Sequence, residues 1–178
     1  MLNDDVKKIL ISEEEIVARC KQLGKQISED YSGTVPVVIG LLKGSVPFMA
    51  ELIKHIIIDC EMEFMDVSSY SGTESMGDVR ILKDLDRSIK GCDVLIVEDI
   101  VDTGKTLQKV KELLYSKGAN SVKVVSLLDK PDRRIVDIQA EYVGFTIPNE
   151  FVIGFGLDFN QKYRNLPFVG VLKEELYK

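Results

Sequence analysis

Apolar and polar residues follow one another along the chain in blocks that predict helices and strands in turn. Apolar Ile16, Leu23 and Ile27 recur at roughly helical spacing near the N-terminus. Ser12 precedes this stretch and can form a capping box with Glu15, three residues further on. We therefore expect the first helix to begin directly after Ser12.

Three short runs are almost wholly apolar and rich in valine and isoleucine. They span residues 36–42, 92–97 and 121–128. Strands buried on both faces of a parallel sheet have this composition. Helices are expected after the first two runs, over about residues 46–57 and 104–117. This alternation predicts an α/β fold with a mainly parallel, twisted sheet flanked by helices.

A strand expected from about residue 58 to 67 has a different pattern. Apolar Cys60, Met62 and Phe64 alternate with acidic residues, so we expect the acidic side to face water. The segment 68–77 that follows is small, polar and contains glycine, which predicts a mobile loop.

Another strand is expected over residues 79–85, and the pattern changes again from Ala140 onward. Short strands with glycine and aromatic residues replace the alternation of strand and helix. We expect residues 145–178 and the N-terminal segment to form a small hood beside the sheet. The whole chain, 1–178, is expected to be one domain.

Composition narrows the class of protein. Hydrophobic residues make up 45% and charged residues 29% of the 178 residues, as in ordinary globular proteins. The net charge of −6 gives no support for nucleic-acid binding, which needs a basic face. Three widely spaced cysteines fit reduced thiols in a cytosol better than disulfides or zinc. No apolar run approaches the ~20 residues that span a bilayer, so we expect a cytoplasmic protein without membrane contact.

The segment 94–107 carries the most chemical information. The buried strand runs into Glu98 and Asp99, a short loop adds Asp102, and Thr-Gly-Lys-Thr at 103–106 starts a helix. Ligands of open α/β sheets bind at the carboxyl ends of strands. Unpaired N–H groups at a helix start, a glycine and two hydroxyls together predict a cradle for one phosphate group.

The three acids cannot hold a phosphate directly. They can hold a hard cation or accept hydrogen bonds from sugar hydroxyls, so the segment suits a ribose 5-phosphate. The plain alternative is a solvated acidic face before an ordinary helix. Acids crowded behind a buried strand repel one another, which argues against that alternative.

Two other phosphate motifs do not fit. A Walker A loop needs glycine five residues before Gly104, where this chain has Asp99. An aspartyl-phosphate phosphatase needs two aspartates separated by one residue, and two residues separate Asp99 from Asp102.

Glu98-Asp99 followed by Asp102-Thr103-Gly104-Lys105-Thr106 resembles the phosphoribosyl pyrophosphate (PRPP) signature of type I phosphoribosyltransferases. Within that family it is most similar to the hypoxanthine-guanine enzymes, and the resemblance covers essentially the whole chain. It implies a purine-salvage transferase that moves the 5-phosphoribosyl group from PRPP to N9 of hypoxanthine or guanine. The products would be IMP or GMP and pyrophosphate, with Mg²⁺ as cofactor and a homodimer or homotetramer as assembly.

The resemblance also implies roles within the signature. Glu98 and Asp99 would bind the ribose hydroxyls, directly or through magnesium. The amides and hydroxyls of residues 102–106 would bind the 5-phosphate. Asp102 would lie near purine N7 and act as general base.

Two flanking segments match the family in order. Lys43-Gly44 resembles the pyrophosphate loop, in which the peptide before the lysine is often cis. Ser69-Tyr70 resembles the flexible catalytic loop that closes over the site and excludes water. A simple strand-to-helix turn and a plain surface loop remain the alternatives.

Residues beyond the signature would complete the site. By the same resemblance, Lys130 would donate to the purine 6-oxo group, Phe151 would stack on the base and the Val152 backbone would read the purine edge. Asp158 would hold a second magnesium through waters, and Arg164 would contact pyrophosphate. Taken alone, each of these is also compatible with a core pair or a surface charge.

Some alternatives stay open. The run 130–134 has an aspartate where some relatives are more basic, which leaves subunit contacts undecided. His55 lies far from the other segments and is interpreted as structural. A nucleic-acid-binding regulator on the same fold is disfavoured because Asp102 is present. Among sister enzymes for xanthine, adenine, uracil or orotate, xanthine is the hardest to separate.

Overall fold

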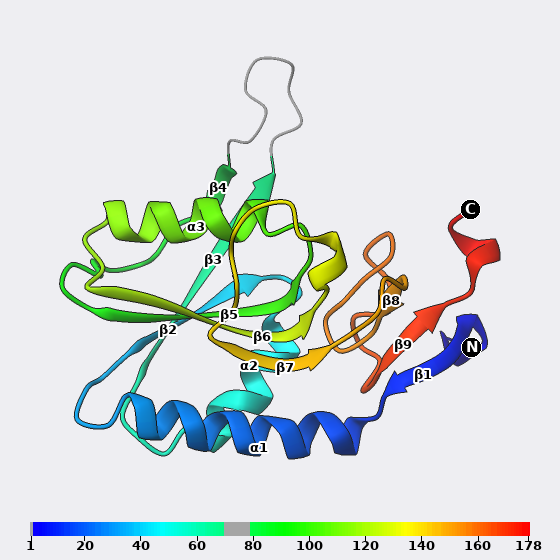
Figure 1. Ribbon diagram of the computed structural model, residues 1–178, viewed down its shortest axis with the longest axis horizontal. Coiled ribbons are helices and arrows are strands. Elements are labelled where there is room, and N and C mark those ends of the chain that lie inside the picture. Colours follow the sequence, from blue (N-terminus) through cyan, green and yellow to red (C-terminus); the bar gives the residue numbers. More distant parts are fainter. Residues whose placement is uncertain (1, 70–78) are drawn as a thin grey trace.

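A six-stranded sheet lies at the centre of the molecule, with helices on both of its faces (Figure 1). The structure is a computed structural model that describes residues 2–69 and 79–178. The strand order is β4-β3-β2-β5-β6-β7, and only β4 runs antiparallel to its neighbour. The strands are β2 Val37–Leu42, β3 Glu61–Ser69, β4 Val79–Lys83, β5 Asp93–Val101, β6 Ser121–Asp129 and β7 Tyr142–Thr146. The predicted α/β fold with a mainly parallel sheet is confirmed.

In the described residues, helices cover both faces of the sheet. Helices α1 (Glu13–Asp30) and α2 (Val46–Leu52) lie on one face, and α3 (Lys105–Ser116) lies on the other (Figure 1). The capping box of α1 forms as predicted. The Glu15 amide donates to Ser12 Oγ over 3.2 Å, and the Glu15 carboxylate accepts from the Ser12 amide over 2.8 Å.

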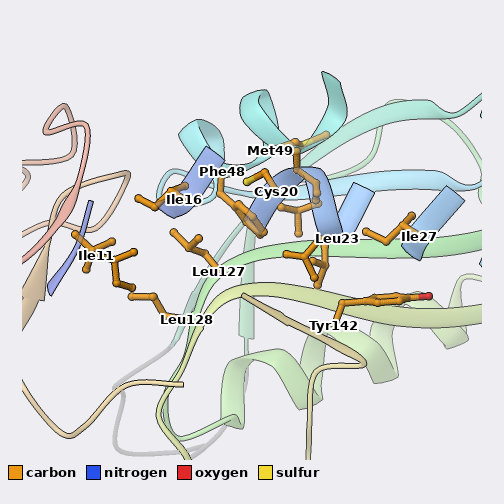
Figure 2. Packing of buried hydrophobic residues seen from close by; sticks show 14 of the residues in the cluster. Ile11, Ile16, Cys20, Leu23, Ile27, Phe48, Met49, Leu127, Leu128 and Tyr142 are labelled. Carbon is orange, nitrogen blue, oxygen red and sulfur yellow. The ribbon is translucent and has the colours of Figure 1, made fainter. Parts of the chain in front are cut away.

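Both faces of the sheet are sealed by apolar packing. On the α1 face, Ile16, Leu23 and Ile27 are fully buried, with Phe48 of α2 packed among them (Figure 2). On the other face the buried side of α3 packs on the strands through Leu107 and its neighbours. Burying one such side chain contributes about 1.5–3 kcal/mol. The strands are thereby held in fixed register, so their carboxyl ends form a rigid edge.

The predicted pattern of β3 holds at Phe64, which packs against the core, and at exposed Glu61, but it is wrong at Met62 and Glu63. Met62 is 51% exposed, whereas Glu63 is only 8% exposed. Glu63 shares its side of the strand with buried Met65, and its carboxylate accepts a hydrogen bond from the Asp86 amide. That bond offsets part of the cost of burying a charge.

The second helix is shorter than the predicted 46–57. It ends at Leu52 and continues as a 3₁₀ turn, Ile53–His55. At this turn the His55 backbone lies so close to Gly24 of α1 that a Cβ on Gly24 would overlap it. His55 hydrogen-bonds Glu51 over 2.9 Å, a contact within its own helical segment.

The two ends of the chain build a second sheet of three antiparallel strands. Its order is β1-β9-β8, with β1 Val6–Ile11, β8 Val152–Ile153 and β9 Val169–Leu172. Strand β1 was not predicted, because Lys7 and Lys8 interrupt its apolar pattern. We propose that this sheet is the hood, which stands beside the ends of the central strands (Figure 1). Further 3₁₀ turns are Leu2–Asp5, Pro131–Arg133 and Glu174–Leu176.

Within the part of the chain that the structure describes, every helix falls short of the length and hydropathy required to cross a membrane.

Candidate active site

A cavity of about 520 Å³ lies between the carboxyl ends of the central strands and the small sheet. Strand β5 contributes Asp99, the segment after β6 contributes Lys130, and the residue directly before β8 is Phe151. The cavity is lined by Asp99, Ile100, Asp102, Lys130, Arg133, Asn149, Glu150, Phe151, Val152, Leu157, Asp158 and Tyr177. Five other predicted site residues therefore share this cavity with Asp99: Asp102, Lys130, Phe151, Val152 and Asp158.

A smaller cavity of about 160 Å³ adjoins the start of α3. It is lined by Glu98, Asp102, Thr103, Gly104 and Thr106, together with apolar neighbours. The residues of the predicted phosphate cradle, apart from Lys105, thus line one cavity, and Asp102 lines both cavities.

Gly104 has a conformation that suits the cradle. It caps α3 with φ +84°, in the left-handed region that favours glycine. A Cβ at this position would overlap Ile138 and crowd Val136. The Lys105 amide points toward Thr103 Oγ1 at 3.5 Å, while the Lys105 side chain is exposed and lines neither cavity.

Burial disfavours the charged forms of Glu98 and Asp99, the acidic pair near the end of β5. Strand β5 continues to Val101, so Glu98 and Asp99 are part of the strand. The sequence had suggested instead that the strand ends before them. Burial, together with the neighbouring Asp99 carboxylate, raises the pKa of Glu98 well above its ordinary value. Burial also raises the pKa of Asp99 to about 6, although the Ile100 amide and Arg164 oppose this rise.

Glu98 Oε2 is buried and has no hydrogen-bond partner among the described residues. This oxygen can therefore accept a hydrogen bond or bind a cation. Sugar hydroxyls or a metal ion would satisfy such carboxylates.

The Lys43-Gly44 segment lies against the same acids. The Leu42–Lys43 peptide is cis, as the resemblance suggested. Gly44 packs on Asp99 so closely that a Cβ would overlap the carboxylate, and its carbonyl leaves no room for a Cβ on Gly156. The backbone of this turn is thus held next to Asp99.

At the other end of the cavity, Lys130 is only 8% exposed. Its ammonium donates to the Glu150 carbonyl over 2.6 Å. Burial lowers the pKa of Lys130, and attraction to Asp102 acts in the opposite direction. The ammonium is therefore held inside the cavity, near the Asp102 carboxylate.

Phe151 supplies an apolar wall. Its ring is stacked on Tyr177, with centroids 4.7 Å apart, and meets Phe159 edge-on at 5.6 Å. The residue is still 37% exposed, and buried Val152 lies beside it in the cavity lining. Phe151 thus offers aromatic surface to a planar ligand.

Asp158 and Arg164 form an ion pair of 2.9 Å at the hood side. Arg164 also donates to the Gly156 carbonyl over 2.7 Å, and the Gln161 amide donates to Asp158 over 2.8 Å. Arg164 lowers the pKa of Asp99 and Asp158 raises it, so both side chains lie close to the acidic pair.

The predicted metal ligands Glu98, Asp99 and Asp158 do not form a ready-made cluster. Across residues 2–69 and 79–178, no three His, Cys, Asp or Glu side chains converge closely enough to hold a metal ion. Mg²⁺ commonly takes one or two carboxylates and completes its shell with water and substrate phosphates. The buried, partnerless Glu98 oxygen beside Asp99 fits that pattern.

One predicted segment is only partly covered. Ser69 is the last residue of β3, and Tyr70 lies outside the described residues. The proposed catalytic loop therefore stays a prediction.

Several cavity residues were not predicted from the sequence. They are Ile100, Arg133, Asn149, Glu150, Leu157 and Tyr177. Asn149 and Glu150 adjoin Phe151 in the chain, so proximity could have suggested them. Tyr177 gave no local signal, because only the folding of the C-terminus brings it to the Phe151 ring.

Comparison with known proteins agrees with this geometry. Residues 7–160 match the family model described as phosphoribosyl transferase domain. The chain therefore belongs to the phosphoribosyltransferase family, the class that the fold and the signature predicted.

Near relatives narrow the class further. A hypoxanthine-guanine phosphoribosyltransferase from Streptococcus thermophilus is 57% identical over 99% of both chains. One from Lactococcus lactis is 58% identical over 99% of this chain and 96% of its own. A crystal structure of a hypoxanthine phosphoribosyltransferase from Staphylococcus aureus superposes with TM-score 0.96 at 53% identity, covering 99% of this chain and 97% of that one. Within the family, the chain groups with the hypoxanthine-guanine phosphoribosyltransferases, as predicted.

Proposed function

We propose that this chain is the purine-salvage transferase that joins hypoxanthine or guanine to the ribose phosphate of PRPP, releasing pyrophosphate. The transferase class and the phosphoribosyl transfer are those of its family. The observation that carries the proposal is the position of Asp102. It lines both the small cradle, with Gly104, and the larger cavity, with Lys130 and Phe151. A sugar phosphate and a base would therefore meet at one carboxylate.

The proposed reaction breaks the bond between ribose C1 and a pyrophosphate oxygen, and forms a bond between C1 and purine N9. Positive charge develops on the sugar as the old bond loosens. Glu98 lines the cradle and Asp99 lines the larger cavity, and the carboxylates of both would favour that charge. The electron pair of the broken bond leaves with pyrophosphate.

Asp102 is proposed to accept the N7 proton as N9 attacks. General base catalysis of this kind contributes a factor of about 10²–10⁴. The base would be held by Phe151 stacking and by Lys130, whose ammonium can donate to a 6-oxo group. A 6-amino group offers no equivalent acceptor, so a 6-oxopurine is preferred.

The departing pyrophosphate would be met by the Lys43-Gly44 turn and by Arg164. Gly44 and Arg164 both lie near Asp99, which supports a shared role for the turn and the guanidinium at the leaving group. Bound Mg²⁺, held by Glu98, Asp99 or Asp158 together with phosphate oxygens, would supply neutralising charge for the leaving group.

The direct test is incubation of the protein with PRPP, Mg²⁺ and a panel of bases, measuring both pyrophosphate and nucleotide. We expect turnover with hypoxanthine and guanine, little with adenine, and loss of turnover when EDTA replaces Mg²⁺. Absence of turnover with every 6-oxopurine would refute the proposal. Including xanthine in the same panel shows whether the protein also accepts it as a substrate.

Asp102→Asn tests the proton acceptor. We expect turnover to fall by a factor of about 10²–10⁴ while PRPP binding changes little, because Asn keeps the shape but cannot take the proton. Asp59→Asn, at an exposed aspartate outside both cavities, is the matched control and should retain full turnover. Undiminished turnover in Asp102→Asn would remove Asp102 from the mechanism.

A cytoplasmic location and a homodimer or homotetramer are part of the proposal, by analogy with the family. Light scattering of the purified protein at working concentration measures the assembly, and a monomer would contradict it.

A further inference from the structure

Arg133 contacts the proposed general base directly, although the sequence did not suggest a role for it. Its Nε donates to Asp102 Oδ1 over 3.1 Å, and both residues line the larger cavity. Asp102 Oδ2 has no hydrogen-bond partner among the described residues. One carboxylate oxygen is therefore occupied, and the other is left for a ligand.

The segment that carries Arg133 is docked on both sides of Asp102. The Lys130 amide donates to the Val101 carbonyl over 3.0 Å, and the Ile135 amide donates to the Thr103 carbonyl over 3.1 Å. Residues 130–135 thus contact three consecutive residues: the backbone of Val101 at the end of β5, the side chain of Asp102 and the backbone of Thr103.

The geometry of this segment is itself fixed. Residues Pro131–Arg133 form a 3₁₀ turn in which the Arg133 amide donates to the Lys130 carbonyl over 3.1 Å. The next residue, Arg134, pairs with Asp129 while both are largely buried, and its side-chain stem packs near Gly104. The ion pair of Arg134 with Asp129 therefore anchors the turn, and Arg133 lines the larger cavity.

The contact between Arg133 and Asp102 is better suited to orienting the Asp102 carboxylate than to stabilising the fold. The side chains of Arg133 and Asp102 are 49% and 40% exposed. Exposed ion pairs contribute only about 0–1 kcal/mol to folding. A contact of this kind can still restrict rotation of a carboxylate whose direction matters for proton transfer, because misplaced catalytic groups lose rate steeply.

We propose that Arg133 is a positioning residue that holds the Asp102 carboxylate with Oδ2 facing the purine. This inference rests on the proposed role of Asp102 as general base. With Oδ1 engaged by the guanidinium, Oδ2 is the oxygen that accepts the N7 proton, and the proton ends on Asp102 while N9 bonds to ribose C1. Arg133 itself contacts neither the sugar nor the reacting atoms in this account.

The first test replaces Arg133 by methionine, which keeps the stem and removes the donors. We expect kcat with hypoxanthine to fall about three- to tenfold, while KM for PRPP stays within about twofold, because the cradle is untouched. Arg133→Lys restores a cation and a donor and should recover part of the lost kcat. Arg87→Met is the matched control, since Arg87 also pairs with an exposed glutamate, Glu61, but lies outside both cavities.

The second test combines the variants. In the Asp102→Asn background, Arg133→Met should cause no further loss of kcat, because the carboxylate that it orients is gone. An equal loss of kcat in both backgrounds would overturn the inference, since Arg133 would then act independently of Asp102. Unchanged kcat in Arg133→Met alone would also overturn it.

These outcomes separate the inference from the proposed function. If Asp102→Asn keeps full turnover, the base assignment fails and the role of Arg133 fails with it. If Asp102→Asn loses turnover while Arg133→Met does not, only the inference fails. Light scattering and thermal unfolding of each variant monitor assembly and folding; a kcat loss that follows altered assembly, and is not rescued by Arg133→Lys, contradicts the positioning role.

Discussion

Asp99→Asn is expected to stabilise the unliganded protein at neutral pH while weakening its activity. Asp99 carries a pKa of about 6 instead of 3.8, with burial as the largest cause. The folded chain thus resists ionisation of this carboxyl, and above pH 6 it must hold the charge at a cost. The Ile100 amide donates a hydrogen bond to Asp99 Oδ1 over 2.7 Å. Asparagine removes the charge and keeps an oxygen that can accept this hydrogen bond.

The size of the effect follows from the shift. A rise from 3.8 to about 6 is roughly two pKa units, and each unit corresponds to about 1.4 kcal/mol. The ceiling is therefore about 3 kcal/mol. The pKa of about 6 already includes the opposing attraction of Arg164, so we expect a net gain of about 1–3 kcal/mol at pH 7.5.

The pH dependence gives the sharper signature. Between pH 3.8 and 6 the folded state binds the Asp99 proton more tightly than the unfolded state does, so this group's contribution to stability falls as pH rises through that window. The penalty is complete above about pH 6 and absent below 3.8. The gain from Asp99→Asn should accordingly be largest at pH 7.5 and shrink at pH 4.5.

Urea unfolding in EDTA, without PRPP, measures this difference at both pH values. For a chain of this size, 1 kcal/mol corresponds to a change in Tm of about 2–4 °C, so thermal unfolding is an independent readout. Asp86→Asn, at a side chain that is 80% exposed, is the control and should change stability little. Equal or lower stability of Asp99→Asn at pH 7.5 would refute the reasoning about a strained acidic pair.

Three further predictions concern base choice, the cradle and the fold. Lys130→Ala should reduce the preference for hypoxanthine over adenine, measured as the ratio of their kcat/KM values; an unchanged ratio would exclude Lys130 from base choice. Gly104→Ala should raise KM for PRPP and cost about 1–3 kcal/mol, because φ +84° disfavours alanine and its Cβ would overlap Ile138; normal PRPP kinetics would contradict the cradle. Ser12→Ala should cost about 1 kcal/mol in urea unfolding without changing kcat, because the capping box with Glu15 is lost; no loss of stability would show that the cap contributes nothing.

The central fold was predictable because its signals are local. Unbroken valine and isoleucine runs predict buried parallel strands, and the spacing after Ser12 predicts α1. The grouping of the proposed cradle residues around one cavity was predictable for the same reason, since Gly104 and its neighbours are contiguous in the chain. Local patterns of this kind need no knowledge of tertiary contacts.

What escaped prediction depends on tertiary contacts. Strand β1 carries two lysines and is a strand because it pairs with β9, 158 or more residues away in the chain. The buried side of β3 is set by what covers the sheet, so Glu63 is inside while Met62 is exposed. Arg133 became notable only once its distance to Asp102 was known.

A crystal structure with IMP and Mg²⁺ tests the central claim most directly. We predict the 5-phosphate at the backbone amides of residues 102–106, the purine against Phe151, and its 6-oxo group within hydrogen-bond distance of Lys130. An IMP molecule bound elsewhere, with the turn at residues 102–106 vacant, would contradict the account.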